Sequence, residues 1–198
     1  SQDRIQEAAR LMAGISPCAI LYALETLAPQ LRNACVQSLV NLALATGNVG
    51  KPSAGLYPLY PGANEQGSRD VGCLPDYLPG YGKVDDGGSR QQLGQAWGTD
   101  LPVTEGMSVR GIAAAIRDGR IKAMMIVGDS GNFVNGELGD VIEALKHLEF
   151  LVVLDSFASE ASGLADAVLP SATFAEKDGT YTNLERRVQL LRPALGAK

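Results

Sequence analysis

The chain has 198 residues, of which 45% are hydrophobic and 20% are charged, close to the average of globular proteins. Its 17 lysine and arginine residues and 22 aspartate and glutamate residues give a net charge of −5. This balance argues against nucleic acid or an anionic membrane surface as the main partner, because both require a cationic face. The apolar runs are far shorter than the roughly 20 residues of a membrane-spanning helix, so direct membrane insertion is not expected.

Cysteine and histidine are scarce in this sequence. It contains three cysteines, Cys18, Cys35 and Cys73, and one histidine, His147. An odd number of cysteines without a Cys-x-x-Cys motif argues against a disulfide framework and favours a reducing compartment. Three thiols cannot form a four-cysteine zinc or iron–sulfur site, so no metal ligand is predicted.

The N-terminal part alternates between helix and strand. Apolar residues at helical spacing predict a helix over 3–14, and Gly14 is placed to end it. An apolar run over 18–24 has the length of a strand, and a second helix is expected from Pro29 to Thr46. Because the sequence opens on a polar helix without an initiator methionine, we expect a piece of a longer polypeptide.

Glycine, proline and aromatic residues dominate residues 47–107. A structureless loop of this length would be unusual inside a domain. The sequence therefore predicts an ordered excursion that packs on the core or on an absent partner domain, with a short helix over 89–97. The aromatic residues that suggest this packing are Tyr57, Tyr60, Tyr77, Tyr81 and Trp97.

The C-terminal part has a regular rhythm of helix and strand. The expected order is helix 108–118, strand 123–127, helix 138–148, strand 150–154, a short helix over 156–164 and strand 167–169. The strands are continuous apolar runs, as expected when helices cover both faces of a parallel sheet. The predicted fold class is α/β, with a doubly wound and mostly parallel sheet. We expect one α/β domain over 1–198, made of the parts 1–46, 47–107 and 108–198.

Two loops after strands carry the first functional signal. Asp129 and Asp155 each follow a predicted strand, and the carboxyl edge of a parallel sheet is where such folds bind ligands. Both carboxylates could accept hydrogen bonds from a ribose or a guanine, or could simply cap the following helix.

Residues 45–52 resemble a phosphate-binding loop but have Ala45 and Pro52 where the motif needs glycine and a hydroxyl residue. Ser130 lacks a histidine base suited to a serine nucleophile.

Several motifs, in order along the chain, resemble the molybdopterin oxidoreductase family. They lie at 39–52, 55–59, 62–67, 70–72, 151–155, 165–170 and 175–189. Within the family, the chain is most similar to the large peripheral-arm subunit of NADH–quinone oxidoreductase, which is complex I. The alternative is the catalytic subunit of a formate dehydrogenase.

The resemblance implies a Rossmann-like, nucleotide-binding domain. In this family, several domains surround a molybdopterin guanine dinucleotide that carries molybdenum or tungsten, and iron–sulfur clusters lie in upstream domains. The resemblance places Gly128, Asp129 and Asn132 in a pterin-dinucleotide loop, Asp155 where guanine is read, and Gln66 in the loop nearest the metal. The implied closing motif contains Glu176, Gly179, Thr180, Asn183, Glu185 and Arg186. No catalytic residue or metal ligand is expected here, and no cofactor is expected on the isolated chain.

The sequence also departs from the formate dehydrogenase pattern. Formate dehydrogenases typically have the motif G-x-N-N-V-Q-G, and the corresponding segment of this chain, 62–67, is one residue shorter. The Gln-His pair that is typical before the second helix is absent from 23–26. The family's Gly-x-Asn-Pro loop is replaced by Gly-Asp-Ser-Gly at 128–131. These departures favour a degenerate cofactor site in a complex I subunit. The partners would then be other domains of the parent chain and other subunits of a respiratory complex. The expected location is cytoplasmic, peripheral to the inner face of the cell membrane.

Overall fold

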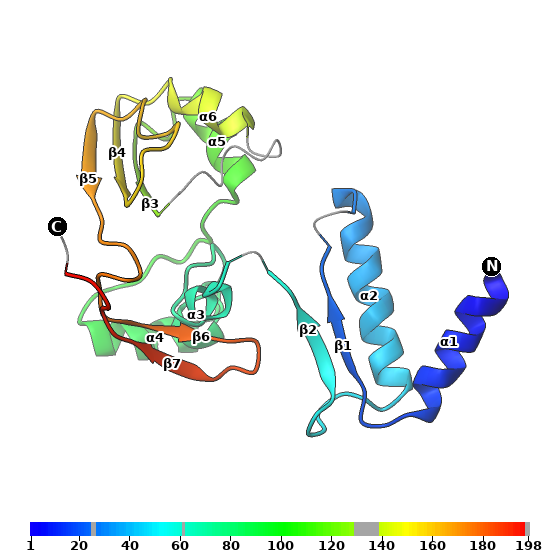
Figure 1. Cartoon of the computed structure of the whole chain (residues 1–198). Coiled ribbons are helices and arrows are strands. Elements are labelled where there is room, and N and C mark those ends of the chain that lie inside the picture. Colours follow the sequence, from blue (N-terminus) through cyan, green and yellow to red (C-terminus); the bar gives the residue numbers. More distant parts are fainter. Residues whose placement is uncertain (25–26, 61, 129–138, 197–198) are drawn as a thin grey trace. The chain divides into compact units, whose positions relative to one another are not determined.

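The structure is a computed structural model that describes residues 1–24, 27–60, 62–128 and 139–196 (Figure 1). Contacts between residues divide the chain into two compact units. Unit 1 contains Ser1–Glu65 and Thr182–Arg187, and unit 2 contains Gln66–Tyr181 and Val188–Lys198. The single domain predicted over residues 1–198 stays a prediction.

Unit 1 contains two helices and a small parallel sheet. Its elements are α1 (Gln2–Gly14), β1 (Ala19–Tyr22), α2 (Pro29–Ala45) and β2 (Gly55–Pro58). Strand β1 pairs with β2 in parallel, with Ala19 opposite Gly55. The two predicted helices and the first strand are confirmed. Strand β2 was not predicted, because glycine and proline at its ends are typical of loops.

The excursion is ordered and contains two further helices. After β2 come α3 (Glu65–Asp70), the 3₁₀ turn η1 (Pro79–Tyr81) and α4 (Gly87–Trp97). The Asp86 side chain accepts a hydrogen bond of 2.8 Å from the Ser89 amide and so caps the first turn of α4. The helix ends at Gly98, whose φ of 68° is the left-handed conformation that favours glycine. The predicted helix over 89–97 is therefore confirmed, with two more residues at its start.

A three-stranded parallel sheet forms the centre of unit 2. The elements are α5 (Val109–Arg117), β3 (Ala123–Val127), α6 (Gly139–Leu145), β4 (Phe150–Asp155) and β5 (Ala167–Pro170). The strand order is β3-β4-β5, with Val127 opposite Leu154 and Asp155 opposite Pro170. The predicted α/β class with parallel strands is confirmed.

Helices α5 and α6 pack together on one face of this sheet (Figure 1). The core between them and the strands contains Ile116, Val141, Leu145, Leu151 and Val153, each at most 2% exposed. Burying such a side chain contributes about 1.5–3 kcal/mol relative to leaving it in water. This core fixes the positions of the strand ends.

The segment between β4 and β5 differs from its prediction. The prediction of a short helix over 156–164 is wrong, because the chain forms bends and turns there. Ser159 and Ser162 bond to each other's backbone: the Ser159 amide donates to Ser162 Oγ (2.8 Å), and the Ser162 amide donates to Ser159 Oγ (3.2 Å). Such local bonds compete with helical ones. Past β5, β6 (Gly179–Thr182) and β7 (Val188–Leu191) form a two-stranded sheet.

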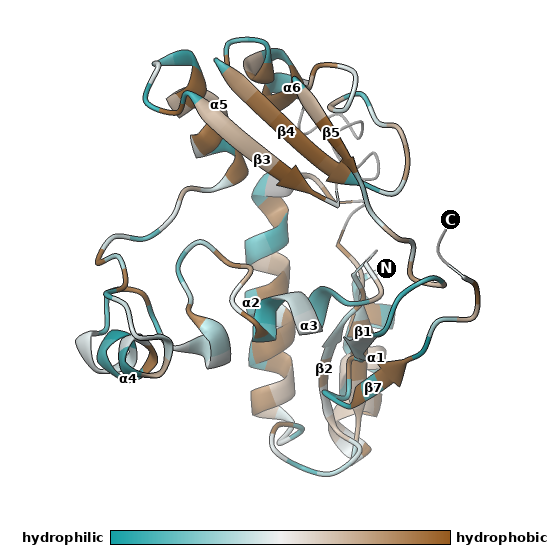
Figure 2. Ribbon diagram, turned by 90° about the vertical axis from the view of Figure 1, so that its left-hand side faces the viewer, coloured by the Kyte–Doolittle hydropathy of each residue, from teal (hydrophilic) through white to brown (hydrophobic). Residues whose placement is uncertain are grey.

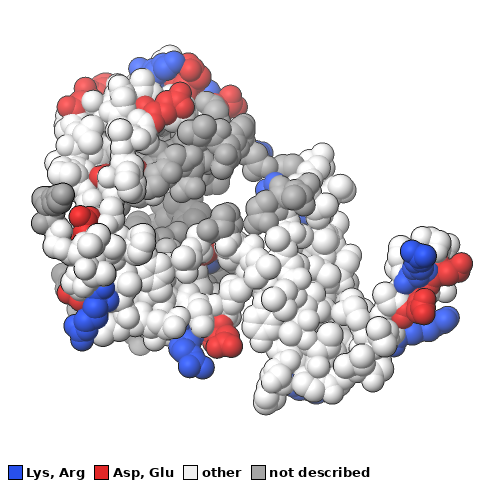
Figure 3. Space-filling model, viewed as in Figure 1, with Lys and Arg blue, Asp and Glu red and all other residues white. Residues whose placement is uncertain are grey.

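On the face shown in Figure 3, charged side chains gather on α1, whereas the neighbouring surface of α2, β1 and β2 shows few of them. Between Leu11 and Tyr60 the sequence has only Glu25, Arg32 and Lys51 as charged residues. Among the described residues, none of the helices is both long enough and apolar enough to span a membrane.

Candidate functional site

The carboxyl ends of β3 and β4 lie side by side at one edge of the parallel sheet. The amide of Gly128, directly after β3, donates a hydrogen bond of 2.9 Å to the carbonyl oxygen of Leu154. Gly128 has a φ of 69°, and within the described residues, its chain neighbours aside, no atom lies within 4 Å of the position that a Cβ would take. Gly128 lies next to the residue that ends β4.

That residue is Asp155, which is only 6% exposed. Its Oδ1 accepts a hydrogen bond of 2.6 Å from the Ser156 amide and a longer contact of 3.5 Å from the Phe157 amide. These bonds hold the carboxylate at the sheet edge. The structure thus brings Gly128 and Asp155 together as the sequence predicts. Asp129 and Asn132, the other predicted residues of this loop, lie outside the described residues.

Gln66 lies in α3 and belongs to a polar network that the sequence did not reveal. Its Nε2 donates to Asp70 Oδ1 (2.7 Å) and to the Tyr81 hydroxyl (2.9 Å). Tyr81 has a φ of 66°, which is uncommon for a non-glycine residue, and its ring makes an edge contact with Tyr77. The network therefore fixes the Gln66 amide through a strained tyrosine. The sequence pointed to Tyr81 only as one of the aromatic residues expected to pack in the excursion, and it did not indicate a contact with Gln66.

The loop before Gln66 contacts the closing motif across 118 residues of sequence. The Thr182 amide donates a hydrogen bond of 2.9 Å to Asn64 Oδ1, and Thr182 is 6% exposed. Two of the motifs that carry the family resemblance thus meet within unit 1. Asn64 is part of the motif at 62–67, but nothing in the sequence identified its partner.

The other closing-motif residues shape the hairpin between β6 and β7. Gly179 and Thr180 lie exposed in β6. Asn183 Oδ1 accepts hydrogen bonds of 3.0 Å from the Glu185 and Arg187 amides and so organises the turn. Arg186 has a φ of 61° in that turn. The Asn183 side chain thus holds the backbone of this turn in place. Its predicted role in cofactor binding stays a prediction.

Glu176 is held by one threonine just before this hairpin. Its Oε2 accepts hydrogen bonds from the Thr173 amide (2.9 Å) and the Thr173 hydroxyl (2.8 Å). These bonds favour the ionised form, with the backbone bond as the largest cause, and they lower the pKa of Glu176 below its ordinary value of 4.5. The carboxylate therefore stabilises the turn between Thr173 and Glu176 when it is ionised.

Replacing Glu176 with glutamine is expected to lower the melting temperature more at pH 7 than near pH 3. A carboxylate with a lowered pKa in the folded state stabilises the fold above its unfolded pKa, and this contribution is lost as the pH falls through the folded pKa. Thermal unfolding followed by circular dichroism at both pH values measures the difference. Glu105→Gln, at an exposed carboxylate, is the control. An equal loss at both pH values would show that the carboxylate charge is not the cause.

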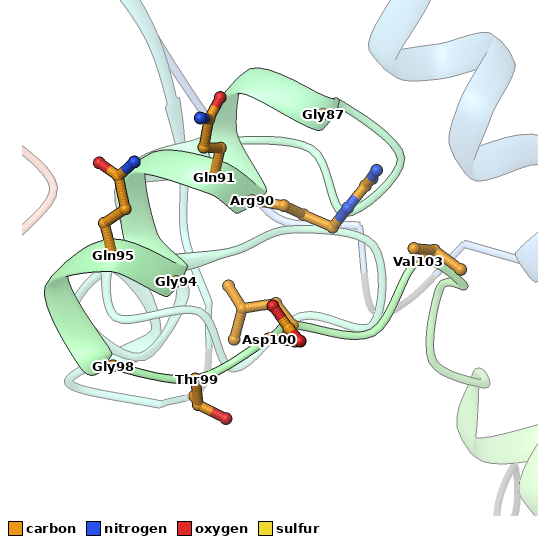
Figure 4. Close-up of a pocket in the computed structure, with 10 residues that line it drawn as sticks. Gly87, Arg90, Gln91, Gly94, Gln95, Gly98, Thr99, Asp100 and Val103 are labelled. Carbon is orange, nitrogen blue, oxygen red and sulfur yellow. The ribbon is translucent and has the colours of Figure 1, made fainter.

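A surface pocket of about 660 Å³ lies beside α4 in unit 2 (Figure 4). Arg90 and Asp100 place opposite charges on its wall, and Gly94 lines it from the helix. The Arg90 guanidinium donates to the Val84 carbonyl oxygen. Among the residues that the structure describes, none of those predicted to bind the cofactor lines this pocket. It is therefore separate from the sheet edge formed by Gly128 and Asp155.

The described residues contain no group of three or more His, Cys, Asp and Glu side chains that could hold a metal ion. The thiols of Cys18, Cys35 and Cys73 are free within this part of the chain. Any ligand that the sheet edge binds would therefore be held by backbone groups, carboxylates and amides.

A family model described as "Molybdopterin oxidoreductase" matches residues 16–198. The chain belongs to the molybdopterin oxidoreductase family. The F420-dependent formate dehydrogenase subunit alpha of Methanocaldococcus jannaschii is 40% identical over 98% of this chain, and the match covers 28% of that protein. Formate dehydrogenase H of Escherichia coli is 34% identical over 100% of this chain and 28% of its own length. The probable oxidoreductase YjgC of Bacillus subtilis is 44% identical over 78% of this chain and 16% of its own length.

The chain thus spans less than a third of the length of these relatives. Their names favour the formate dehydrogenase interpretation over the complex I subunit that the motifs favoured. The family match shows that the chain is part of a molybdopterin-family oxidoreductase. In this family a molybdenum or tungsten pterin is the expected cofactor.

Proposed function

We propose that this chain forms part of the molybdopterin guanine dinucleotide site of a formate dehydrogenase-like oxidoreductase. The observation that carries the proposal is the position of Gly128, bonded to Leu154, beside Asp155 at the carboxyl edge of a parallel sheet, where open α/β folds bind nucleotides. The relatives named as formate dehydrogenases support it.

The residues at this edge fit the nucleotide part of the cofactor. Asp155 offers a buried carboxylate, and a carboxylate accepts two parallel hydrogen bonds from the N1–H and amino groups of guanine. The open space beside Gly128 would let a phosphate or sugar approach the backbone. When bound, the cofactor would supply the redox chemistry through its metal.

The proposal includes predicted cofactor contacts from two further parts of the chain, helix α3 and the closing hairpin. Gln66 would face the cofactor from α3, with its amide oriented by Asp70 and Tyr81. Gly179, Thr180 and Asn183 would contribute backbone and side-chain polar groups from the closing hairpin. Asp129 and Asn132 are included on the family resemblance alone.

The test is a cofactor and activity assay of the full-length protein, produced in a bacterial host that makes molybdopterin guanine dinucleotide. We expect close to one molybdenum or tungsten per polypeptide by mass spectrometry of the digested protein, and formate-dependent reduction of benzyl viologen. The 198-residue chain prepared in the same host is expected to retain no metal, because its described residues contain no cluster of three or more side chains that could hold a metal ion. Full-length protein with neither metal nor formate activity would contradict the proposal.

The second candidate is a complex I subunit that keeps this fold without the cofactor. The observation in its favour is the departure of residues 62–67 and 128–131 from the formate dehydrogenase pattern. In that case, the partners would be other domains of the parent chain and other respiratory subunits, in a complex peripheral to the inner face of the membrane. Iron without molybdenum or tungsten in the full-length protein, together with NADH-linked electron transfer, would favour this candidate.

A further inference from the structure

The Gln66 side chain leaves only one of its two polar groups to a ligand. Its Nε2 carries two hydrogens, and both are used. Nε2 lies 2.7 Å from Asp70 Oδ1 and 2.9 Å from the Tyr81 hydroxyl oxygen, and it donates to both. Within the described part of the chain, no donor bonds to the Oε1 atom of Gln66. The half-buried side chain therefore offers a ligand a hydrogen-bond acceptor and no donor.

Asp70 fixes this orientation by its chemistry. Gln66 and Asp70 are four residues apart in α3, so they lie on the same face of the helix. An ionised carboxylate accepts hydrogen bonds and donates none, so the amide must turn its nitrogen toward Asp70. The sequence of α3 contains no apolar side chain, and Figure 2 shows the helix in hydrophilic to neutral colours. Polar bonds, rather than apolar packing, therefore set how the Gln66 side chain lies.

Tyr81 is held where its hydroxyl group meets Gln66. Its φ of 66° is strained for a residue with a side chain, and such a conformation persists only where the surrounding structure imposes it. The chain is tightly packed around this turn, because a Cβ on Gly72 would lie 2.8 Å from Pro79 Cδ. The Tyr81 ring also makes an edge contact with the ring of Tyr77. The fold thus maintains a strained backbone that places the tyrosine hydroxyl group at the Gln66 amide.

We propose that Gln66 binds an N–H group in the pterin part of the cofactor through Oε1, and that Asp70 and Tyr81 are positioning residues that hold this polarity. The inference rests on the proposed function, and it adds the atom that makes the contact and the kind of group that this atom selects. Pterin rings carry ring N–H and amino groups, which donate to a carbonyl oxygen. The phosphate groups of the cofactor carry acceptor oxygens, which the same atom would repel. Gln66 therefore distinguishes the ring system of the cofactor from its phosphates.

A reciprocal exchange of the two side chains tests this polarity in the full-length protein. Gln66→Glu brings two carboxylates together and is expected to speed the loss of molybdenum or tungsten during dialysis about fivefold, as for one hydrogen bond of ordinary strength. Gln66→Glu combined with Asp70→Asn restores a donor and an acceptor between the two positions and still turns an acceptor oxygen to the cofactor. We expect this double variant to lose metal at a rate within about twofold of the parent. Gln37→Glu, at an exposed residue of α2, is the control for added charge.

The rate of metal loss from the double variant decides the outcome. A rate as fast as that of Gln66→Glu alone would show that the cofactor does not read the polarity of this residue and would overturn the proposal. So would a Gln66→Glu protein that keeps its metal as well as the parent does. Full-length parent protein that contains no metal would instead contradict the proposed function itself, which the two results above leave standing.

Tyr81→Phe tests the positioning role by a second route. It removes the hydroxyl group and keeps the ring, whereas the control Tyr57→Phe removes a hydroxyl group that donates to the Ala54 carbonyl oxygen (3.3 Å). We expect Tyr81→Phe to speed metal loss in the parent but to add nothing in the Gln66→Ala background, because its action passes through Gln66. Tyr57→Phe is expected to have no effect in either background. Equal effects of Tyr81→Phe in both backgrounds would show that the tyrosine acts independently and would overturn its positioning role.

Discussion

Replacing Asn48 with alanine is expected to lower the free energy of unfolding of unit 1 by about 2–4 kcal/mol. Asn48 is 2% exposed and lies in the turn after α2. Its Oδ1 accepts a hydrogen bond of 2.9 Å from the Cys18 amide, and its Nδ2 donates one of 2.9 Å to Thr46 Oγ1. The side chain thus connects the end of α2 to the start of β1. Alanine would leave the Cys18 amide without this acceptor and would add a small cavity.

Urea unfolding of the 198-residue chain, followed by circular dichroism, measures this loss. Asn41→Ala is the matched control, because Asn41 is exposed on α2 and alanine has the higher helix propensity. We expect Asn41→Ala to leave the stability unchanged or to raise it slightly. A loss below about 0.5 kcal/mol for Asn48→Ala would show that water replaces the side chain, and that Asn48 does not hold the two elements together.

The second large effect is expected at Asp155 in the full-length protein. Asp155→Asn replaces one acceptor oxygen with a donor amide, so one of two hydrogen bonds to guanine would be lost. Charge-assisted hydrogen bonds contribute about 1.5–3 kcal/mol each, which corresponds to at least about a tenfold loss of cofactor affinity. Molybdenum or tungsten per polypeptide after extended dialysis, together with formate-dependent dye reduction, measures the effect.

Asp166→Asn is the control for this experiment. Asp166 lies directly before β5, and its Oδ2 accepts a hydrogen bond of 2.7 Å from the Leu151 amide. It is an aspartate of the same sheet but outside the predicted guanine position. Asparagine keeps a carbonyl oxygen for the backbone amide at both positions, so we expect little change in stability from either substitution. Full metal content and activity in Asp155→Asn would remove Asp155 from the cofactor site, and equal metal loss in both variants would indicate a folding effect.

Local patterns in the sequence determined most of the elements. The strands β3, β4 and β5 were predicted within one residue of their observed ends, because uninterrupted apolar runs of this length are typical of buried parallel strands. Gly14, Pro29 and Gly47 marked the helix ends through their backbone preferences. The family motifs, in order along the chain, identified the family that the comparison then showed.

Tertiary structure decided the features that depend on residues far apart in sequence. The bond between Thr182 and Asn64 spans 118 residues, and no local pattern specifies such a partner. The Gln66–Tyr81 bond required a tyrosine with a positive φ, which only a surrounding fold can impose. The continuous apolar strands predicted that helices cover both faces of the sheet. Only the tertiary structure showed that the described helices α5 and α6 both lie on the same face of the β3-β4-β5 sheet. Composition and periodicity report what a residue prefers, whereas its actual neighbours are set by how the whole chain packs.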